Sequence, residues 1–163
     1  MRAILLACLL GCGDAWALEA GAPMPPLAAP ALDDAAQPVS LAATRGDVVY
    51  VDFWASWCGP CKISMPVLEA MQQKYGKRGF RVIGVNKDVS VADARRFLRQ
   101  VPVGFTLVHD GGDKLAQAFD VKAMPSGYLV DRRGVVRYVH RGFTSASEAA
   151  LEREIAGLLE EKP

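Results

Sequence analysis

The sequence predicts an α/β domain in which a central mixed β-sheet is flanked by helices. Strand-like and helix-like patterns alternate along residues 48–119, a turn joins two short apolar runs within residues 127–140, and an amphipathic segment ends the chain. The length of 163 residues fits one domain preceded by a leader. The formal net charge is +1, so the composition gives no sign of a nucleic-acid partner.

The elements are expected in the order strand, helix, strand, helix, strand, helix, strand, strand, helix. Residues 48–55 form a near-continuous apolar run, which is typical of a central strand covered on both faces. A helix should begin just after Cys58 and stop at the polar residues 77–79. The further strands are expected over residues 80–85, 105–108, 127–130 and 135–140, and the further helices over residues 91–100, 114–119 and 147–160.

Residues 1–17 have the pattern of a signal peptide. A basic start precedes an apolar run too short to cross a bilayer, and Ala15 and Ala17 fit a cleavage site after Ala17. Residues 9–12, Leu-Leu-Gly-Cys, also resemble a bacterial lipobox, in which Cys12 would carry a lipid anchor. Both routes place the protein in the periplasm or cell envelope, soluble in the first case and lipid-anchored in the second. A retained start of the chain is the third alternative.

An arm rich in Pro and Ala follows over residues 18–38, with five prolines between residues 23 and 38. This composition predicts an extended segment, with a short edge strand near residues 39–41. The folded domain itself is expected over residues 39–163. No internal repeat and no block of like charges interrupts it.

Cys58 and Cys61 carry the chemistry that the sequence predicts. The other two cysteines, Cys8 and Cys12, lie in the leader. Cys58 stands where the first long strand passes into a helix, and a helix N-terminus favours the negatively charged thiolate, which is the attacking form of the thiol. Cys61 follows about one helical turn later, within disulfide reach. The pair therefore predicts dithiol–disulfide exchange.

Other uses of two cysteines fit this sequence less well. A structural zinc site needs four ligands, and the two histidines, His109 and His140, have no zinc-knuckle spacing. Covalent haem attachment needs a histidine directly after the second cysteine, where Lys62 stands. A purely structural disulfide would close a very small loop and constrain the unfolded chain little. We therefore expect neither a metal nor a cofactor.

Residues 52–62, Asp-Phe-Trp-Ala-Ser-Trp-Cys-Gly-Pro-Cys-Lys, resemble the active-site segment of thioredoxins. The leader, the arm, the extra segment around residues 88–110 and the Met-Pro pair at residues 124–125 resemble the TlpA/ResA family of exported thioredoxin-like proteins. This resemblance covers about residues 20–160. It implies a thioredoxin-like fold with an N-terminal extension and a central insertion. It also implies an exported oxidoreductase that reduces protein disulfides and takes its electrons from a membrane thiol reductase.

The resemblance also implies roles for individual residues. Asp52 would be a buried base toward the Cys61 thiol, the alternative being a carboxylate at a strand end that reaches water. Pro125 would be a cis proline that brings the Met124 backbone beside Cys58 to pair with an extended substrate, the alternative being an ordinary trans proline. The further candidates are Trp57, Gly59 and Pro60 around the cysteines, Gly142 lining the substrate groove, and Pro66 kinking the active-site helix.

Three positions depart from the family pattern. Ser64 stands where many ResA-like proteins carry Glu, and Ser126 stands where cytochrome-maturation reductases carry Glu after the cis proline. Gly84 occupies the position of a thioredoxin lysine. A reductase specialised for cytochrome c maturation is therefore a weaker alternative than a general disulfide reductase. The rival from another class is a non-catalytic binding module or chaperone, against which the intact cysteine pair argues.

Overall fold

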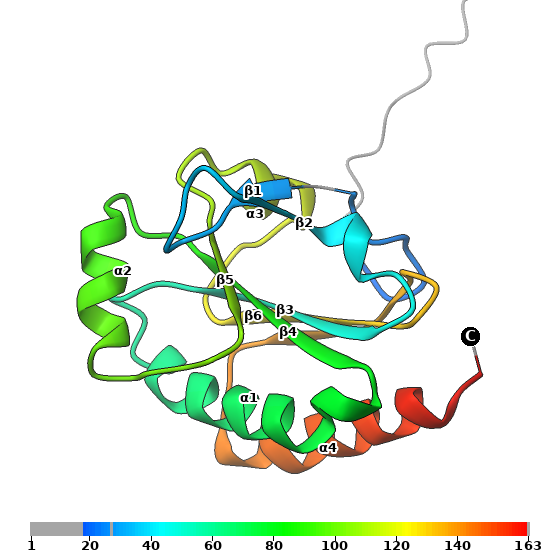
Figure 1. Cartoon of the computed structure of the whole chain (residues 1–163). Coiled ribbons are helices and arrows are strands. Elements are labelled where there is room, and N and C mark those ends of the chain that lie inside the picture. The colour runs from blue at the N-terminus through cyan, green and yellow to red at the C-terminus, as the bar shows by residue number, and fades with distance from the viewer. Residues whose placement is uncertain (1–17, 27, 163) are drawn as a thin grey trace, which may run out of the picture.

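The computed structural model describes residues 18–26 and 28–162. The signal peptide expected over residues 1–17, with Cys8 and Cys12, lies outside the described residues. A five-stranded sheet in the order β5-β4-β3-β6-β7 forms the centre of the fold (Figure 1). Its strands are β3 (Val48–Trp54), β4 (Phe80–Asn86), β5 (Thr106–His109), β6 (Ser126–Val130) and β7 (Val136–Arg141). β3 runs parallel to β4 and antiparallel to β6, so the expected mixed sheet is confirmed.

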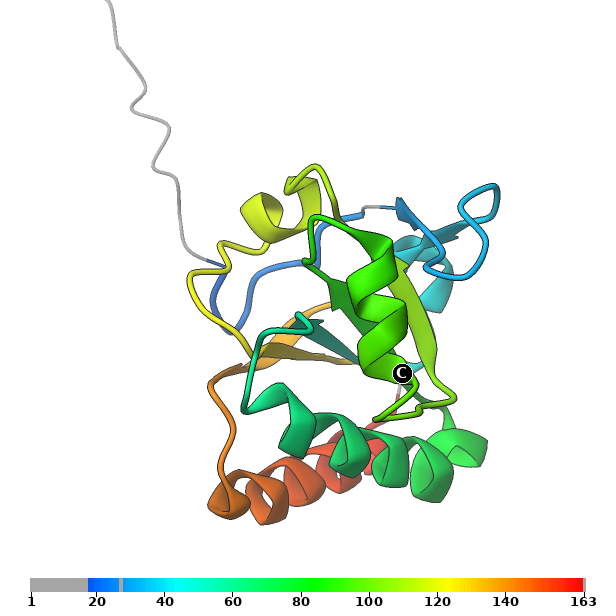
Figure 2. The same cartoon turned by 90° about the vertical axis from the view of Figure 1, so that its left-hand side faces the viewer.

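Helices cover the sheet on both sides (Figures 1 and 2). α1 (Cys61–Tyr75) and α4 (Ser145–Glu160) lie on one face, and the short α3 (Lys114–Ala118) lies with the N-terminal arm on the other. α2 (Val91–Leu98) belongs to the central insertion and packs into the core on the α1 side. Among residues 18–26 and 28–162, no helix combines the length and the apolar character needed to cross a bilayer.

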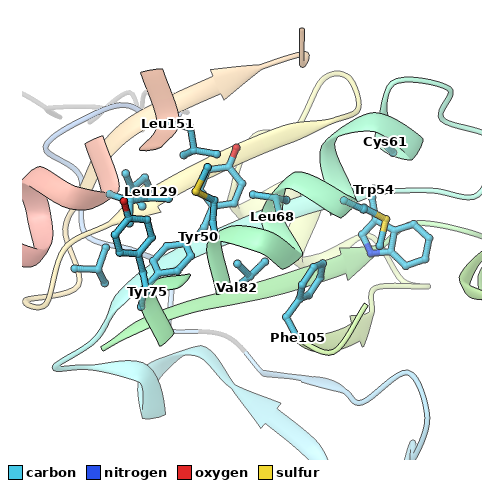
Figure 3. Packing of buried hydrophobic residues seen from close by; sticks show 14 of the residues in the cluster. Tyr50, Trp54, Cys61, Leu68, Tyr75, Val82, Phe105, Leu129 and Leu151 are labelled. Atoms are coloured by element: carbon cyan, nitrogen blue, oxygen red, sulfur yellow. The ribbon is translucent and has the colours of Figure 1, made fainter. Parts of the chain in front are cut away.

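β3 separates two hydrophobic cores because its side chains point alternately to the two faces of the sheet. Tyr50 and Trp54 belong to the core under α1 and α4, part of which is drawn in Figure 3. Val51 and Phe53 belong to the core under α3 and the arm. Burial on both faces accounts for the near-continuous apolar run in the sequence. It also places Asp52 on the same face as Tyr50 and Trp54.

The arm packs more closely against the domain than its composition predicts. The strand expected near residues 39–41 is β2 (Pro38–Ser40), and it pairs with β1 (Ala28–Pro30) in a separate two-stranded sheet, not at the edge of the main sheet. The backbone N–H of Leu32 donates to the carbonyl oxygen of Leu107 on β5. Four apolar side chains of the arm are buried: Leu18, Met24, Ala29 and Leu32. Their burial, which proline content alone does not indicate, holds the arm against the sheet.

The active-site helix begins later than expected. The sequence predicts a start just after Cys58, whereas α1 begins at Cys61 with Pro60 as its N-cap. Residues 58–60 form a turn, in which Cys61 N–H donates to the carbonyl oxygen of Cys58. Proline has no N–H to donate, so it fits the entry to a helix. Cys58 therefore precedes the helix by three residues and faces its N-terminus.

Candidate active site

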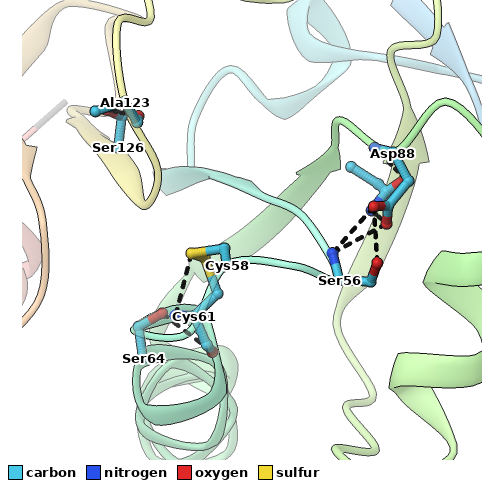
Figure 4. Close-up of a disulfide and its surroundings, with 8 residues drawn as sticks. Ser56, Cys58, Cys61, Ser64, Asp88, Ala123 and Ser126 are labelled. Atoms are coloured by element: carbon cyan, nitrogen blue, oxygen red, sulfur yellow. Dashed lines mark hydrogen bonds between the residues drawn. A yellow bond between two sulfur atoms is a disulfide. The ribbon is translucent and has the colours of Figure 1, made fainter.

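The sulfur atoms of Cys58 and Cys61 are joined in a disulfide at the start of α1 (Figure 4). Cys61 is fully buried, whereas Cys58 retains 4% exposure. The backbone N–H of Cys61 points at the Cys58 sulfur, with an N···S distance of 3.3 Å. A donor at this position favours negative charge on Cys58, as does the positive end of the α1 helix dipole. The structure therefore brings together the two cysteines that the sequence singles out, at the start of α1.

The turn that carries Cys58 is tied to the end of β4. The carboxylate of Asp88 accepts hydrogen bonds from the Ser56 N–H at 3.0 Å and from the Ser56 hydroxyl at 2.8 Å (Figure 4). Asn86 donates a third bond, at 2.8 Å, to the same carboxylate. Asp88 is buried. Sequence reasoning missed it, although β3 and β4 are parallel and the residues that follow their carboxyl ends lie at one edge of the sheet.

Asp52 is a buried carboxyl group without a hydrogen-bond partner for its Oδ2 atom among the described residues. Its residue is 1% exposed, and burial raises its pKa to about 8. Its neighbours across the sheet are Gly84 on β4 and Gly127 on β6. Alternation along β3 directs the carboxyl group toward the core that contains Cys61. Such a group can take up and release a proton near neutral pH.

The Met124–Pro125 peptide bond is cis, as the resemblance implies. Gly142 lies beside it with a φ of 82°, and its N–H donates to the carbonyl oxygen of Pro125 at 2.8 Å. The Ser126 hydroxyl donates a hydrogen bond to the carbonyl oxygen of Ala123 across this loop. Both residues lie in the surroundings of the disulfide (Figure 4). No hydrogen bond of the Met124 backbone is found within the described part of the chain. That backbone is free to pair with another extended segment.

Two large apolar side chains close to the cysteines in the sequence are exposed. Trp57 is 68% exposed and Ile63 is 59% exposed, on either side of the cysteine pair in the sequence. Gly59 and Pro60 between the cysteines are also exposed. Trp54, in contrast, is fully buried and packs against Phe97. Of the two tryptophans within the described residues, Trp57 is thus the one that a docking protein can reach.

A polar chain on the same face of the sheet was not anticipated from the sequence. The hydroxyl of Tyr50 lies 3.2 Å from Nδ1 of His140, and Nε2 of His140 lies 2.8 Å from a carboxylate oxygen of Glu154. These residues come from β3, β7 and α4. No local sequence motif marks any of these three residues, and only the tertiary structure brings them together. The alternation within residues 48–54 is the one sequence signal that places Tyr50 and Asp52 on a common face.

The model of the Redoxin family matches residues 19–155. The chain belongs to the Redoxin family. This Redoxin is similar to the thiol-disulfide oxidoreductase ResA of Bacillus cereus, with 29% identity over 98 residues that cover 60% of the chain and 57% of that relative. It is also similar to ResA of Geobacillus kaustophilus, with 27% identity over 70% of the chain and 64% of that relative. The matches thus span less than two thirds of the length of these curated relatives.

A solved structure matches this Redoxin over a larger share of both chains. It is the crystal structure of a candidate thiol:disulfide interchange protein DsbE from Chlorobium tepidum, with 43% identity and a TM-score of 0.83. The match covers 88% of the present chain and 99% of that chain. The thioredoxin-like fold and the likeness to the TlpA/ResA group are therefore confirmed.

Proposed function

We propose that this Redoxin is an exported thiol–disulfide oxidoreductase that reduces protein disulfides. The observation that carries the proposal is the Cys58–Cys61 disulfide at the N-terminus of α1, with the Cys61 N–H directed at the Cys58 sulfur. The names of the similar ResA proteins support the same chemistry.

In the first step, the reduced Cys58 thiolate attacks one sulfur of a substrate disulfide. A bond forms between that sulfur and Cys58, and the other substrate sulfur leaves as a thiolate with the two bonding electrons. The free backbone of Met124, beside the cis Pro125, offers a place for the substrate strand to pair during this step. The exposed Trp57 supplies apolar contact beside it.

In the second step, Cys61 releases the substrate. Its thiol gives its proton to the Asp52 carboxylate, and the resulting thiolate attacks the Cys58 sulfur. The Cys58–Cys61 disulfide forms, and the second substrate sulfur leaves as a thiolate. Two electrons have then passed from the dithiol to the substrate, and the proton on Asp52 returns to the solvent. A thiol reductase in the membrane restores the dithiol for the next turnover.

The direction of the reaction follows from the reduction potential of the pair. The dipeptide Gly59-Pro60 between the cysteines is that of thioredoxins, which are reductants. We expect equilibration with glutathione redox buffers to give a potential near about −270 mV, the value of a reductase. A potential near about −120 mV would instead make the protein an oxidant.

Two cysteine variants test the assignment of roles. Cys58→Ser should abolish insulin reduction, because the attacking sulfur is absent. Cys61→Ser should also lose turnover but accumulate a mixed disulfide through Cys58, visible as a mass increase that dithiothreitol reverses. Full turnover by Cys58→Ser would overturn the proposal. Peptide binding by the wild-type protein without any turnover would favour a non-catalytic binding module.

The proposed location in the cell envelope rests on residues 1–17 of the sequence. Cleavage after Ala17 would leave Leu18, which packs in the core under the arm, as the first residue of the mature protein. Mass spectrometry of the protein from a cell-envelope fraction distinguishes the three outcomes. A mature start at Leu18 supports a soluble periplasmic protein, an acylated Cys12 supports a lipid anchor, and an intact Met1 in the cytosolic fraction contradicts export.

A further inference from the structure

A cavity of about 360 Å³ lies beside Met124, in the loop that joins α3 to β6. Its apolar lining comes from Ala116 on α3 and from Val121, Ala123 and Met124 in that loop. Met124 packs against both hydrophobic cores, the one that contains the two cysteines and the one under α3. Ala123 lies in the surroundings of the disulfide (Figure 4). The cavity therefore borders the site of disulfide exchange, on the α3 side of the sheet.

Charged side chains complete the lining of this cavity and form ion pairs with one another. Lys87, which directly follows β4, pairs with the carboxylates of Asp110 and Asp113 at the start of α3. Asp120 pairs with Lys122 in the loop after α3. Three carboxylates thus share two ammonium groups, which leaves a net charge of −1. The cavity therefore combines an apolar lining with an excess of negative charge.

Asp120 is the carboxylate at this cavity that a cation from outside can engage most easily. The side chain of its partner, Lys122, is 75% exposed. An exposed ion pair holds its two groups together weakly, because water solvates both charges. The Lys87 side chain, in contrast, is 9% exposed and its ammonium group is held by two carboxylates, so it presents no unpaired positive charge. A cation from a bound substrate can therefore replace Lys122 at Asp120.

An extended substrate segment along the Met124 backbone would place neighbouring side chains on opposite sides, because side chains alternate along a strand. The attacked cysteine of the substrate has to point toward Cys58, which belongs to the core under α1. The side chain next to it in the substrate then points toward the α3 side of the sheet (Figure 1). The cavity lies on that side. It is therefore placed to receive the residue adjacent to the attacked cysteine.

We propose that this cavity selects substrates with a lysine or arginine next to the attacked cysteine, and that Asp120 is the specificity-determining residue. The inference rests on the proposed function, since it names the substrate class of the same site. A long side chain with a cationic end matches the lining, because its methylene groups pack on the apolar residues while its charge reaches the Asp120 carboxylate. A glutamate side chain at the same place would instead meet the excess of negative charge.

The test uses three peptides of one sequence that carry Arg, Gln or Glu on both sides of a cysteine joined to 2-mercaptoethanol as a disulfide. The second-order rate constant for oxidation of the reduced protein by each peptide is measured by alkylation of the remaining thiols. Rates with dithiothreitol correct for the intrinsic reactivity of each peptide disulfide. The corrected rate constant should be about two- to fivefold higher for Arg than for Gln, and lower for Glu than for Gln. High salt should reduce both differences, because it screens exposed charges.

Two variants at the cavity should change the preference in opposite directions. Asp120→Asn removes the charge, and asparagine tolerates the φ of 53° at this position, so the preference for Arg over Gln should nearly disappear. Lys122→Gln removes the competing cation and should increase the preference.

Matched controls are Asp33→Asn in the arm and Lys77→Gln after the end of α1, both at exposed positions, which should leave the preference unchanged. Equal rates with the Arg and Gln peptides in the wild-type protein would overturn the proposal. So would a preference for Arg that persists in Asp120→Asn.

Failure of this inference is distinguishable from failure of the proposed function. Peptides with serine in place of the cysteine bind to the oxidised wild-type protein without any turnover, and NMR signals of the backbone N–H groups of residues 116–124 report on that binding. The Arg peptide should bind more tightly than the Gln peptide, and Asp120→Asn should remove the difference. Full turnover by Cys58→Ser would refute the function, and the binding comparison would still decide the role of the cavity. Reduction of all three peptides at one rate would leave the function standing and refute the inference.

Discussion

Gly84 lies directly opposite Asp52 across the parallel strands β3 and β4. A Cβ atom at residue 84 would lie 2.6 Å from Leu107, 3.0 Å from Phe105 and 3.1 Å from the indole nitrogen of Trp54. Apolar and aromatic side chains therefore fill the space beside Asp52 in which thioredoxins carry a lysine. This packing leaves Asp52 without a cation from β4, and burial alone raises its pKa.

We expect Gly84→Ala to destabilise the protein, because three packed side chains, two of them buried and that of Leu107 partly buried, would have to move. The cost should be about 1–3 kcal/mol, which is typical of an overpacked core. Urea unfolding measures it. Gly112→Ala is the matched control, since a Cβ at that exposed position meets nothing within 4 Å. Equal stability of the two variants would show that the space beside Asp52 is not closely packed.

Asp52→Asn should make the protein more stable than wild type, and this difference in the free energy of unfolding should grow as the pH rises. The folded-state pKa of Asp52 is about 8, whereas the ordinary pKa of an aspartate is 3.8. Between about pH 4 and pH 8 the unfolded chain loses a proton that the folded protein keeps, so the wild-type free energy of unfolding falls with pH. The variant lacks this loss. The free energy of unfolding of the variant should exceed that of the wild type only slightly near about pH 4. The difference should reach several kcal/mol, at most about 5, near about pH 8.

Thermal unfolding over this pH range measures the difference, with Asp33→Asn as a control at an exposed aspartate. An advantage of Asp52→Asn that stays constant with pH would mean that Asp52 does not titrate in this window. In the same variant, insulin reduction should slow, because the second step loses its proton acceptor.

Asp88→Asn should loosen the turn that carries Cys58. The amide would present a donor to groups that are themselves donors, namely the Ser56 N–H, the Ser56 hydroxyl and the Asn86 amide. The loss in stability should be about 1.5–3 kcal/mol, as for hydrogen bonds to a charged group. Amide hydrogen exchange at Ser56 and Cys58 should accelerate more than exchange in the centre of β3.

Asp93→Asn provides the comparison for Asp88. Asp93 pairs with Arg96 on the surface of α2, and its side chain is 46% exposed. Removing such a pair costs about 0.5 kcal/mol or less. If Asp88→Asn costs no more than this control, the buried carboxylate does not hold the active-site turn.

Trp57→Ala should weaken the action on protein disulfides while stability changes little. The side chain is 68% exposed, so its removal should change the free energy of unfolding by at most about 0.5 kcal/mol. Loss of one apolar contact with the substrate should lower kcat/KM for insulin about fivefold, or about 1 kcal/mol. The rate with a small disulfide such as cystine should stay nearly constant. Tyr138→Ala, a partly exposed aromatic on β7, should leave both rates unchanged.

The fold class and the cysteine pair could be predicted from the sequence because both depend on local patterns. The alternation of apolar runs with helical periodicity identifies the strands and helices in order, and the turn before the last strand identifies the hairpin. The Cys-Gly-Pro-Cys segment between a strand and a helix is likewise contiguous. Element ends were less accurate: α1 begins at Cys61 and α4 at Ser145, because turns and caps at helix starts compete with the helical pattern.

The sequence by itself determined which residues share a face of β3, since side chains alternate along any strand. Only the tertiary structure decided which residues of other strands stand beside them. The pairing of Asp52 with Gly84 and Gly127, and of Gly127 with His140, depends on strand register, which is set by packing between segments up to 90 residues apart, as for Tyr50 and His140. The cysteine pair can therefore be predicted from the sequence, whereas the surroundings that set the proton affinity of Asp52 cannot.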